Sequence, residues 1–382
     1  MRRQLMISAG KAEDGFQSGG KSQPASSIRV AVITPGLCLC LLGAIMSTSG
    51  VFSKRNTQVP GTDENRADRS IKACTGLVLT TRFVADSRTV AIAGSDKSLK
   101  LWDIDSGRVR QIPQEFAVRC LTLSSDGRRF ATCYSDKEVH LYDTASGVRS
   151  FVLRTPDPVR LVAFDPRGEL LAAGHCDGSI TVWDLESRRP RLSMTEEVLE
   201  QGSPPQFPKL VSMIYSPDGK TLIAGSGDGR IRMWDSDTGH LRGEWIAHTT
   251  AVDVLAITPQ GNTLASATCL EREVKLWELP TGRLRTKFRV EDIGVKALEF
   301  ALDGATLTSV GAAKNFRVWD VRTGRVLARL RGSDGWGWTL NYSRDGNWLV
   351  SGGTDGMVGV WRTNRLGSQA PSVASRCDPL WQ

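Results

Sequence analysis

The stretch IRMWDSDTGHLR, Ile231–Arg242, ends an apolar run on a tryptophan, follows it with an acid and then makes a turn. The same arrangement recurs along the chain, each time around one aromatic residue. These residues are Trp102, Tyr142, Trp183, Trp234, Trp277, Trp319 and Trp361, at intervals of 40, 41, 51, 43, 42 and 42 residues. Such regular spacing indicates a repeat protein, in which each unit packs against the next.

Each unit predicts four short strands. Around Trp234 the strands are LVSMIY, TLIAGS, IRMWD and LRGEWI, separated by SPDGK, GDGR and SDTGH. Asp-Gly between apolar runs predicts a type I′ turn, with positive φ at both central residues. The turn acids, six residues before the aromatic, are Asp96, Asp136, Asp177, Asp228 and Asp355. Because such a unit cannot bury both faces alone, we expect an all-β fold, a seven-bladed β-propeller of four-stranded antiparallel blades.

The ends of the third strands carry a family resemblance. They read LWD, VWD, MWD and VWD in four units, with the weaker LYD, LWE and VWR in the others. Over residues 68–365 the chain therefore resembles the WD-repeat family of β-propellers. The resemblance implies a non-catalytic scaffold for other proteins, and a hydrogen-bonded set of His, Ser or Thr, turn acid and Trp in a blade. Only His248 stands at the expected histidine position, with Ser266, Glu271 and Trp277 as companions.

Closing the ring requires a strand from each end of the repeat region. In the internal units the fourth strand begins about 34 residues before the next aromatic, and the same count back from Trp102 reaches Asp68. The equivalent stretch after Trp361 contains Gly367 and Pro371, and it predicts a poor strand. We therefore expect residues 68–73 to supply the outer strand of the last blade, and 366–382 to form an irregular tail.

An uncharged stretch precedes the repeats. Residues 30–52 contain no charged side chain and are long enough to span a bilayer. They follow a polar tail, 1–29, and precede a polar linker, 53–67. The first interpretation is a single membrane anchor, the second a cleaved export signal and the third a misassigned start codon. Either of the first two gives a protein at, or moved across, a membrane, with its orientation open.

Charge and cysteine usage exclude several classes of protein. Of the net charge of +8, part comes from residues 1–70, which leave 40 Lys and Arg against 36 Asp and Glu in the remainder. This balance is unlike a surface that binds nucleic acid, so no such partner is expected. Eight cysteines without a CxxC pair indicate neither a disulfide scaffold nor a metal site, and we expect no cofactor. Cys120 and Cys133 would face each other across a hairpin, either as thiols or oxidised.

One ring of positions is a candidate partner-binding surface. The residue after the first apolar position of each first strand should point toward the mouth of the propeller. These positions hold Leu79, Arg119, Arg160, Val211, Asp253, Lys296 and Trp338, and we call them the rim. Cations beside Trp338 and the neighbouring Trp336 suit an acidic peptide or protein segment. Ordinary solvated side chains, or tryptophans packed between blades, are the alternative reading.

Two other features complete the functional reading. The 51-residue interval between Trp183 and Trp234 places extra chain in Met194–Leu210, which is acidic and rich in proline. This loop is a second binding element, a tolerated insertion or an intramolecular partner of the rim cations. The Thr-Gly turns after the aromatics superficially resemble those of quinone-dependent propellers, which makes an enzyme or small-molecule binder the alternative function. No catalytic motif accompanies those turns, so a scaffold is the preferred interpretation and no catalytic residue is assigned.

Overall fold

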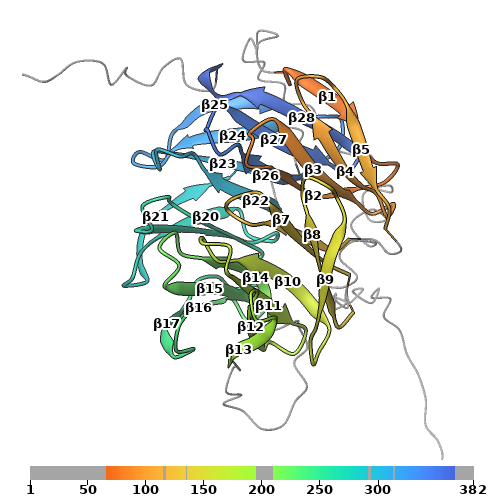
Figure 1. Ribbon diagram of the computed structural model, residues 1–382. Helices are drawn as coiled ribbons and strands as arrows, with labels where there is room; N and C mark the ends of the chain where they lie inside the picture. Colours follow the sequence, from red (N-terminus) through yellow and green to blue (C-terminus); the bar gives the residue numbers. More distant parts are fainter. Residues whose placement is uncertain are drawn as a thin grey trace, which may run out of the picture. The chain divides into compact units, whose positions relative to one another are not determined.

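The computed structural model describes residues 66–114, 118–134, 136–194, 210–290, 294–312 and 315–365. In that part of the chain the strands form seven four-stranded antiparallel sheets. The seven-bladed fold expected from the repeat is therefore confirmed (Figure 1). The uncharged stretch 30–52, the tail 1–29, the tail 366–382 and most of the Met194–Leu210 loop lie outside the described residues. No helix in the described ranges has the length and apolar character needed to cross a bilayer.

The first four blades follow one another along the chain. Blade 1 consists of β2 (Val78–Phe83), β3 (Thr89–Gly94), β4 (Leu99–Asp103) and β5 (Val109–Ile112). Blade 2 consists of β6 (Cys120–Leu123), β7 (Arg129–Cys133), β8 (Glu138–Asp143) and β9 (Arg149–Arg154). Blade 3 consists of β10 (Val159–Phe164), β11 (Leu170–His175), β12 (Ile180–Asp184) and β13 (Arg189–Met194). Blade 4 consists of β14 (Leu210–Tyr215), β15 (Thr221–Ser226), β16 (Arg230–Asp235) and β17 (Leu241–Ile246).

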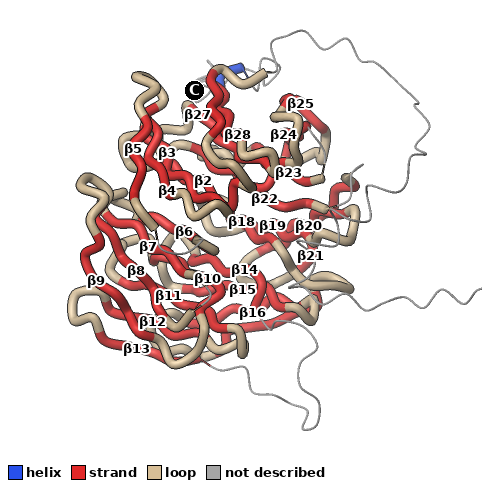
Figure 2. Tube along the Cα trace, turned by 90° about the vertical axis from the view of Figure 1, so that its right-hand side faces the viewer, coloured by secondary structure: helices blue, strands red, loops and turns tan. Residues whose placement is uncertain are grey.

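The last three blades complete the ring. Blade 5 consists of β18 (Val254–Ile257), β19 (Thr263–Ala267), β20 (Glu273–Glu278) and β21 (Arg283–Arg289). Blade 6 consists of β22 (Val295–Phe300), β23 (Thr306–Gly311), β24 (Asn315–Asp320) and β25 (Val326–Arg331). Blade 7 consists of β26 (Gly337–Tyr342), β27 (Trp348–Gly353), β28 (Met357–Arg362) and β1 (Arg69–Lys72), and a 3-10 helix, η2 (Thr363–Arg365), follows it (Figure 2). The first strands of neighbouring blades contact one another, and β2 contacts β26, so these strands form a closed inner ring.

The two ends of the repeat region share one sheet. β1 pairs antiparallel with β28, with Arg69 opposite Val360 and Lys72 opposite Met357. The amide of Asp68 donates to the carbonyl of Val360 at 2.8 Å, and the Asp68 carboxylate accepts the amide of Arg362 at 2.8 Å. Figure 1 shows the two strands side by side although they come from opposite ends of the sequence. This clasp removes the open edge that blade 7 would otherwise present.

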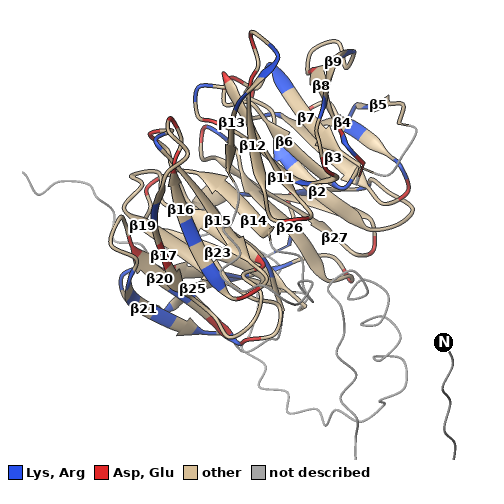
Figure 3. Ribbon diagram, turned by 90° about the horizontal axis from the view of Figure 1, so that it is seen from below, with Lys and Arg blue, Asp and Glu red and all other residues tan. Residues whose placement is uncertain are grey.

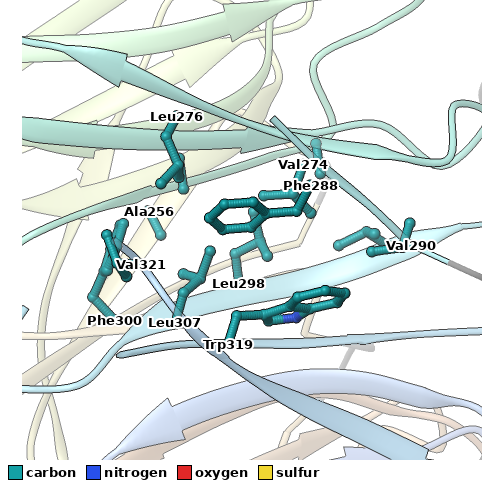
Figure 4. Packing of buried hydrophobic residues seen from close by; sticks show 13 residues of the cluster. Ala256, Val274, Leu276, Phe288, Val290, Leu298, Phe300, Leu307, Trp319 and Val321 are labelled. Atoms are coloured by element: carbon teal, nitrogen blue, oxygen red, sulfur yellow. The ribbon is translucent and has the colours of Figure 1, made fainter. Parts of the chain in front are cut away.

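Buried side chains pack between blades. Each anchor aromatic is buried and lies opposite an apolar residue of the second strand, as Trp319 lies opposite Leu307. In the cluster of Figure 4, Phe288 of blade 5 stacks on Trp319 of blade 6, with 5.8 Å between ring centroids. Leu298 and Ala256 fill the same layer from the inner strands of the two blades. The core is thus repeated at each blade-to-blade interface, as stacked repeats require.

The turns before the third strands differ from the expected type. Gly178, Gly229 and Gly356 have positive φ, but the aspartates that precede them do not, so the type I′ prediction is wrong. The loop is a three-residue turn in which only the last residue is left-handed. Each aspartate instead accepts the amide two residues ahead at 2.9–3.1 Å, which an ordinary φ allows. These acids are Asp96, Asp136, Asp177, Asp228 and Asp355.

Blade 1 has a lysine where blades 3, 4 and 7 have this turn glycine, and the difference carries a testable cost in stability. Lys97 is exposed and has a φ of 63°. We expect Lys97→Gly to raise the free energy of unfolding by about 1 kcal/mol, because glycine adopts this conformation without a Cβ clash. Urea denaturation of both proteins measures the difference. Lys97→Ala is the control, since it removes the charge and keeps the strain, and an equal gain from it would contradict the explanation.

One blade contains the complete hydrogen-bonded set that the resemblance implies. In blade 5, His248 Nδ1 lies 2.6 Å from the Glu271 carboxylate and its Nε2 lies 2.8 Å from Ser266 Oγ. Trp277 Nε1 donates to the same hydroxyl at 2.8 Å. Among described residues, the indole N–H groups of Trp102, Trp183 and Trp361 are buried without a hydrogen-bond partner. The blades therefore differ in whether the indole of their anchor tryptophan is hydrogen-bonded.

Candidate functional site: the rim of the inner ring

Bulges place the rim side chains at equivalent positions. In five blades the pairing of the first two strands shifts by one residue at the rim, at Leu79, Arg160, Val211, Lys296 and Trp338. In the other two blades the rim residues immediately precede the first strand. There the amides of Arg119 and Asp253 donate to the carbonyls of Cys133 and Ala267 at 2.9 and 3.1 Å. Since a bulge leaves the extra residue outside the ladder and re-aims its side chain, the seven positions form one set.

Two arginines of the rim are electrostatic neighbours. Arg119 of blade 2 is exposed, and Arg160 of blade 3 is half-buried. Burial, followed by the charge of Arg119, lowers the pKa of the Arg160 guanidinium, while Cys176 and Asp253 act in the opposite direction. The Asp253 carboxylate also accepts the amide of Cys269 at 2.6 Å. This side of the rim therefore holds two like charges that act on each other electrostatically, and its carboxylate also accepts a backbone amide.

A second pair of rim residues, Lys296 and Trp338, lies on blades 6 and 7. The Lys296 ammonium of blade 6 lies over the Trp338 ring of blade 7, 4.9 Å from its centroid. Both side chains are half-buried, so the cation and the indole face present one joint surface. Trp336 lies in the loop before β26, where its amide donates to Thr354 Oγ1 at 2.9 Å and its carbonyl accepts the Thr354 amide at 2.9 Å. The structure thus joins Lys296 with Trp338, and it places Trp336 outside the bulge position.

The inner strands also carry a group of three polar residues, here called the polar tier, that the sequence did not lead us to expect. Glu299, Asn341 and Arg82 occupy the same strand position in blades 6, 7 and 1. Asn341 accepts the amide of Phe83 at 2.9 Å, and its Nδ2 lies 3.5 Å from Glu299 Oε1. Burial raises the pKa of Glu299 to about 7, and the charge of Arg82 and the amide of Asn341 offset part of this rise. Each residue stands 20 positions before the anchor aromatic of its blade, so their shared repeat position could have predicted that they lie at the same level of the ring.

The buried carboxyl predicts a pH effect on stability. Glu299 titrates at about 4.5 when unfolded and at about 7 when folded, so the fold favours the protonated form. Its favourable contribution to the free energy of unfolding is therefore fully present below pH 4.5 and is lost as the pH rises to 7. We expect Glu299→Gln to gain about 2 kcal/mol over the wild type between pH 5 and pH 8, because the amide stays neutral. Denaturation midpoints at both pH values measure this gain, and Glu186→Gln, on an exposed turn, is the control.

Parallel pH profiles for the wild type and Glu299→Gln would contradict the assignment.

The rim presents charged and aromatic side chains. Its side chains offer guanidinium, ammonium, carboxylate and indole groups, and no hydroxyl or thiol nucleophile belongs to the rim set. Groups of three or more His, Cys, Asp or Glu side chains close enough to hold a metal ion do not occur within the described ranges. In the view of Figure 3, segments with Lys or Arg alternate with segments bearing Asp or Glu over the strands and turns. Positive and negative side chains are therefore interspersed over the face seen in this view.

The family follows from the fold together with the sequence match. The family of the WD domain, G-beta repeat, matches residues 68–103, 108–143, 147–184, 207–235, 239–278 and 324–362. The chain belongs to the WD-repeat family, whose propellers serve as scaffolds and adaptors. The matched ranges omit residues 279–323, the stretch that carries Trp319, and in the structure this stretch forms β21, β22, β23 and β24.

Individual relatives share part of their length with this chain. The small ribosomal subunit protein RACK1 of Caenorhabditis elegans is 32% identical over 165 residues, which cover 42% of this chain and 50% of that protein. Autophagy-related protein 16 of Arabidopsis thaliana is 26% identical over 215 residues, which cover 55% and 39%. These curated relatives are thus matched over half of their length or less. A chain in the crystal structure of the mitotic checkpoint complex superposes with a TM-score of 0.69 at 17% identity, covering 82% of this chain and 96% of that chain.

Proposed function

We propose that this protein is a non-catalytic scaffold that binds an acidic segment of a partner protein at the rim. The observation that carries the proposal is that two rim cations on neighbouring blades, Arg119 and Arg160, act on each other electrostatically, so a partner carboxylate would interact favourably with both. Lys296 and Trp338 supply a second contact, suited to an aromatic or acidic side chain. A stiff ring of bulged strands keeps these groups in place before binding, which limits the entropy lost on association.

The relatives support a role in assemblies. RACK1 is named as a protein of the small ribosomal subunit, and the structural relative belongs to a mitotic checkpoint complex. Both descriptions concern multi-protein assemblies, and they extend to this chain only as analogy. The partner of this chain is defined in the proposal by its chemistry, an acidic segment, rather than by these names.

Affinity capture from the native host tests the proposal. The full chain is the bait, beside a variant with Arg119→Ala, Arg160→Ala, Lys296→Ala and Trp338→Ala. A matched control changes three exposed cations of β21, with Arg283→Ala, Arg285→Ala and Lys287→Ala, and removes the same positive charge from an outer strand. Each variant must melt like the wild type. We expect the wild type and the control to retain the same proteins, and the rim variant to lose them.

Two results would reject the rim. Identical captures by all three baits would show that the partner binds elsewhere, and the Met194–Leu210 loop would become the next surface to test. Retention of nucleic acid with a steep loss between 50 and 200 mM salt would favour the nucleic-acid class instead. A chromophore or turnover in the purified protein would revive the enzyme alternative.

We also propose that residues 30–52 associate the protein with a membrane, as an anchor or as a cleaved signal. An uncharged stretch of that length supports both readings. Carbonate extraction of host membranes, followed by N-terminal sequencing of the protein, separates them. An anchor remains in the membrane with its N-terminus intact, whereas a cleaved signal gives a shorter, extractable chain. An extractable chain of full length would reject both.

A further inference from the structure

Two cysteines of blade 2 lie directly opposite each other. Cys120 of β6 pairs with Cys133 of β7, as expected from their positions around the hairpin turn. Residues paired in this way have Cβ atoms about 4.5–5.5 Å apart, close to the separation that a disulfide spans. Paired residues project from the same face of the sheet, which lets the Cys133 thiol serve as the hydrogen-bond donor that shifts the pKa of Cys120. Only a small movement separates this pair from a covalent bond.

The surroundings make the two thiols unequal. The hydrogen bond from Cys133 lowers the pKa of Cys120 to about 7, and the amide of Val162 and the charges of Arg82 and Arg119 act in the same direction against the effect of burial. Cys133 keeps its proton, because that hydrogen bond and burial raise the pKa of its thiol. A thiolate beside a protonated thiol is the arrangement in which one sulfur attacks and the other resolves.

Access to the pair is restricted. Cys120 is half-buried on the inner strand, and Cys133 is fully buried behind it. Cys74, another buried cysteine, contrasts with the pair, because burial raises its pKa and its sulfur accepts from Ser98 rather than from a second thiol. Small reagents therefore reach Cys120 first, and Cys133 reacts only through it.

We infer that Cys120 and Cys133 form a reactive dithiol site, which hydrogen peroxide converts into a cross-strand disulfide. The Cys120 thiolate attacks one peroxide oxygen, the O–O bond breaks, and the leaving oxygen takes up a proton, giving a sulfenic acid and water. Cys133 then attacks the Cys120 sulfur, the S–O bond breaks, and the departing hydroxide takes the Cys133 proton as a second water. Two thiols are oxidised and one peroxide is reduced, so atoms and electrons balance.

The site also fits trivalent arsenicals, which bind two adjacent thiols and release water. The disulfide removes a negative charge next to Arg119, and it would therefore change the rim, a consequence that rests on the proposed function. The dithiol chemistry itself does not depend on any partner. Failure of the partner capture and failure of the oxidation are therefore separate results.

Peptide mapping tests the disulfide directly. Trypsin separates the pair, placing Cys120 in CLTLSSDGR, 120–128, and Cys133 in FATCYSDK, 130–137. After hydrogen peroxide treatment of the native full chain and alkylation of remaining thiols, we expect these peptides to be joined, and dithiothreitol to release them. Cys176→Ser should keep the joined product, since Cys176 is the other thiol near Arg160. Cys120→Ser and Cys133→Ser should abolish it while melting like the wild type.

A second measurement needs no oxidation. Iodoacetamide labelling of Cys120, followed by mass spectrometry across pH 5–10, should have a midpoint near 7. In Cys133→Ala the midpoint should move toward 9, which lowers the labelling rate at pH 7 about ten-fold or more. One equivalent of phenylarsine oxide should protect both cysteines of the wild type. Separate peptides after peroxide, with Cys133 still alkylated, or a Cys120 midpoint near 9, would overturn the inference.

Discussion

Gly356→Ala is expected to lower the free energy of unfolding by about 4 kcal/mol, because it combines backbone strain with a clash against main chain. Gly356 has a φ of +75°, and an added Cβ would lie 2.1 Å from the carbonyl oxygen of Cys74 and 2.7 Å from that of Gly76. Its own carbonyl accepts the amides of Ala73 and Cys74, so the turn cannot shift without loosening the clasp.

A matched glycine separates the two effects. Gly107 has a φ of +73°, and nothing lies within 4 Å of an added Cβ. Gly107→Ala should therefore cost only the strain of the left-handed conformation, about 1 kcal/mol. Urea denaturation of both variants gives the comparison. Equal losses would mean that the carbonyls of Cys74 and Gly76 move away freely, and that the clasp is not held by this turn.

The second large effect is expected at Ser266, whose hydroxyl serves two partners. The Glu271 carboxylate can only accept, so His248 Nδ1 carries the proton and Nε2 accepts from Ser266. Burial lowers the pKa of His248 below its ordinary value, which keeps the ring neutral. Ser266→Ala leaves the indole N–H of Trp277 and His248 Nε2 without partners in the core, and should cost about 3 kcal/mol.

Ser309 of blade 6 provides the control for that prediction. Its hydroxyl accepts only the indole N–H of Trp319 among described partners, at 2.8 Å. Ser309→Ala should cost about 1.5 kcal/mol, half the effect at Ser266. Thermal or urea unfolding of the two variants decides the ratio. Equal costs would mean that His248 contributes nothing through Ser266.

The repeat spacing predicted the parts of this molecule that backbone pairing dictates. The position of Asp68, counted from Trp102, locates the clasp strand, and the lone histidine position of blade 5 identifies His248 and its partners. The turn type could not be read from Asp-Gly alone, because the aspartate side chain binds the backbone and makes a second left-handed residue unnecessary.

The repeat spacing grouped the rim residues as equivalent positions, and the structure adds which of them contact one another. Lys296 meets Trp338 because a bulge in each strand turns both side chains, and a bulge has no reliable mark in one sequence. The tier of Arg82, Glu299 and Asn341 joins residues from blades 1, 6 and 7, and closure of the ring brings blades 1 and 7 together. Their partner-binding or structural roles remain predictions until the variants are measured.

The clasp can form only after the end of the repeat region has been synthesised. The contact between Asp68 and Arg362 joins residues 294 positions apart. At a translation rate of about 5–20 residues per second, the strand at the start waits roughly 15 to 60 s for its partner to be made. During that interval the finished blades keep an open seam, and limited proteolysis of nascent chains stalled before β28 should find β1 accessible. The ring is thus closed last, by the earliest strand of the described residues to leave the ribosome.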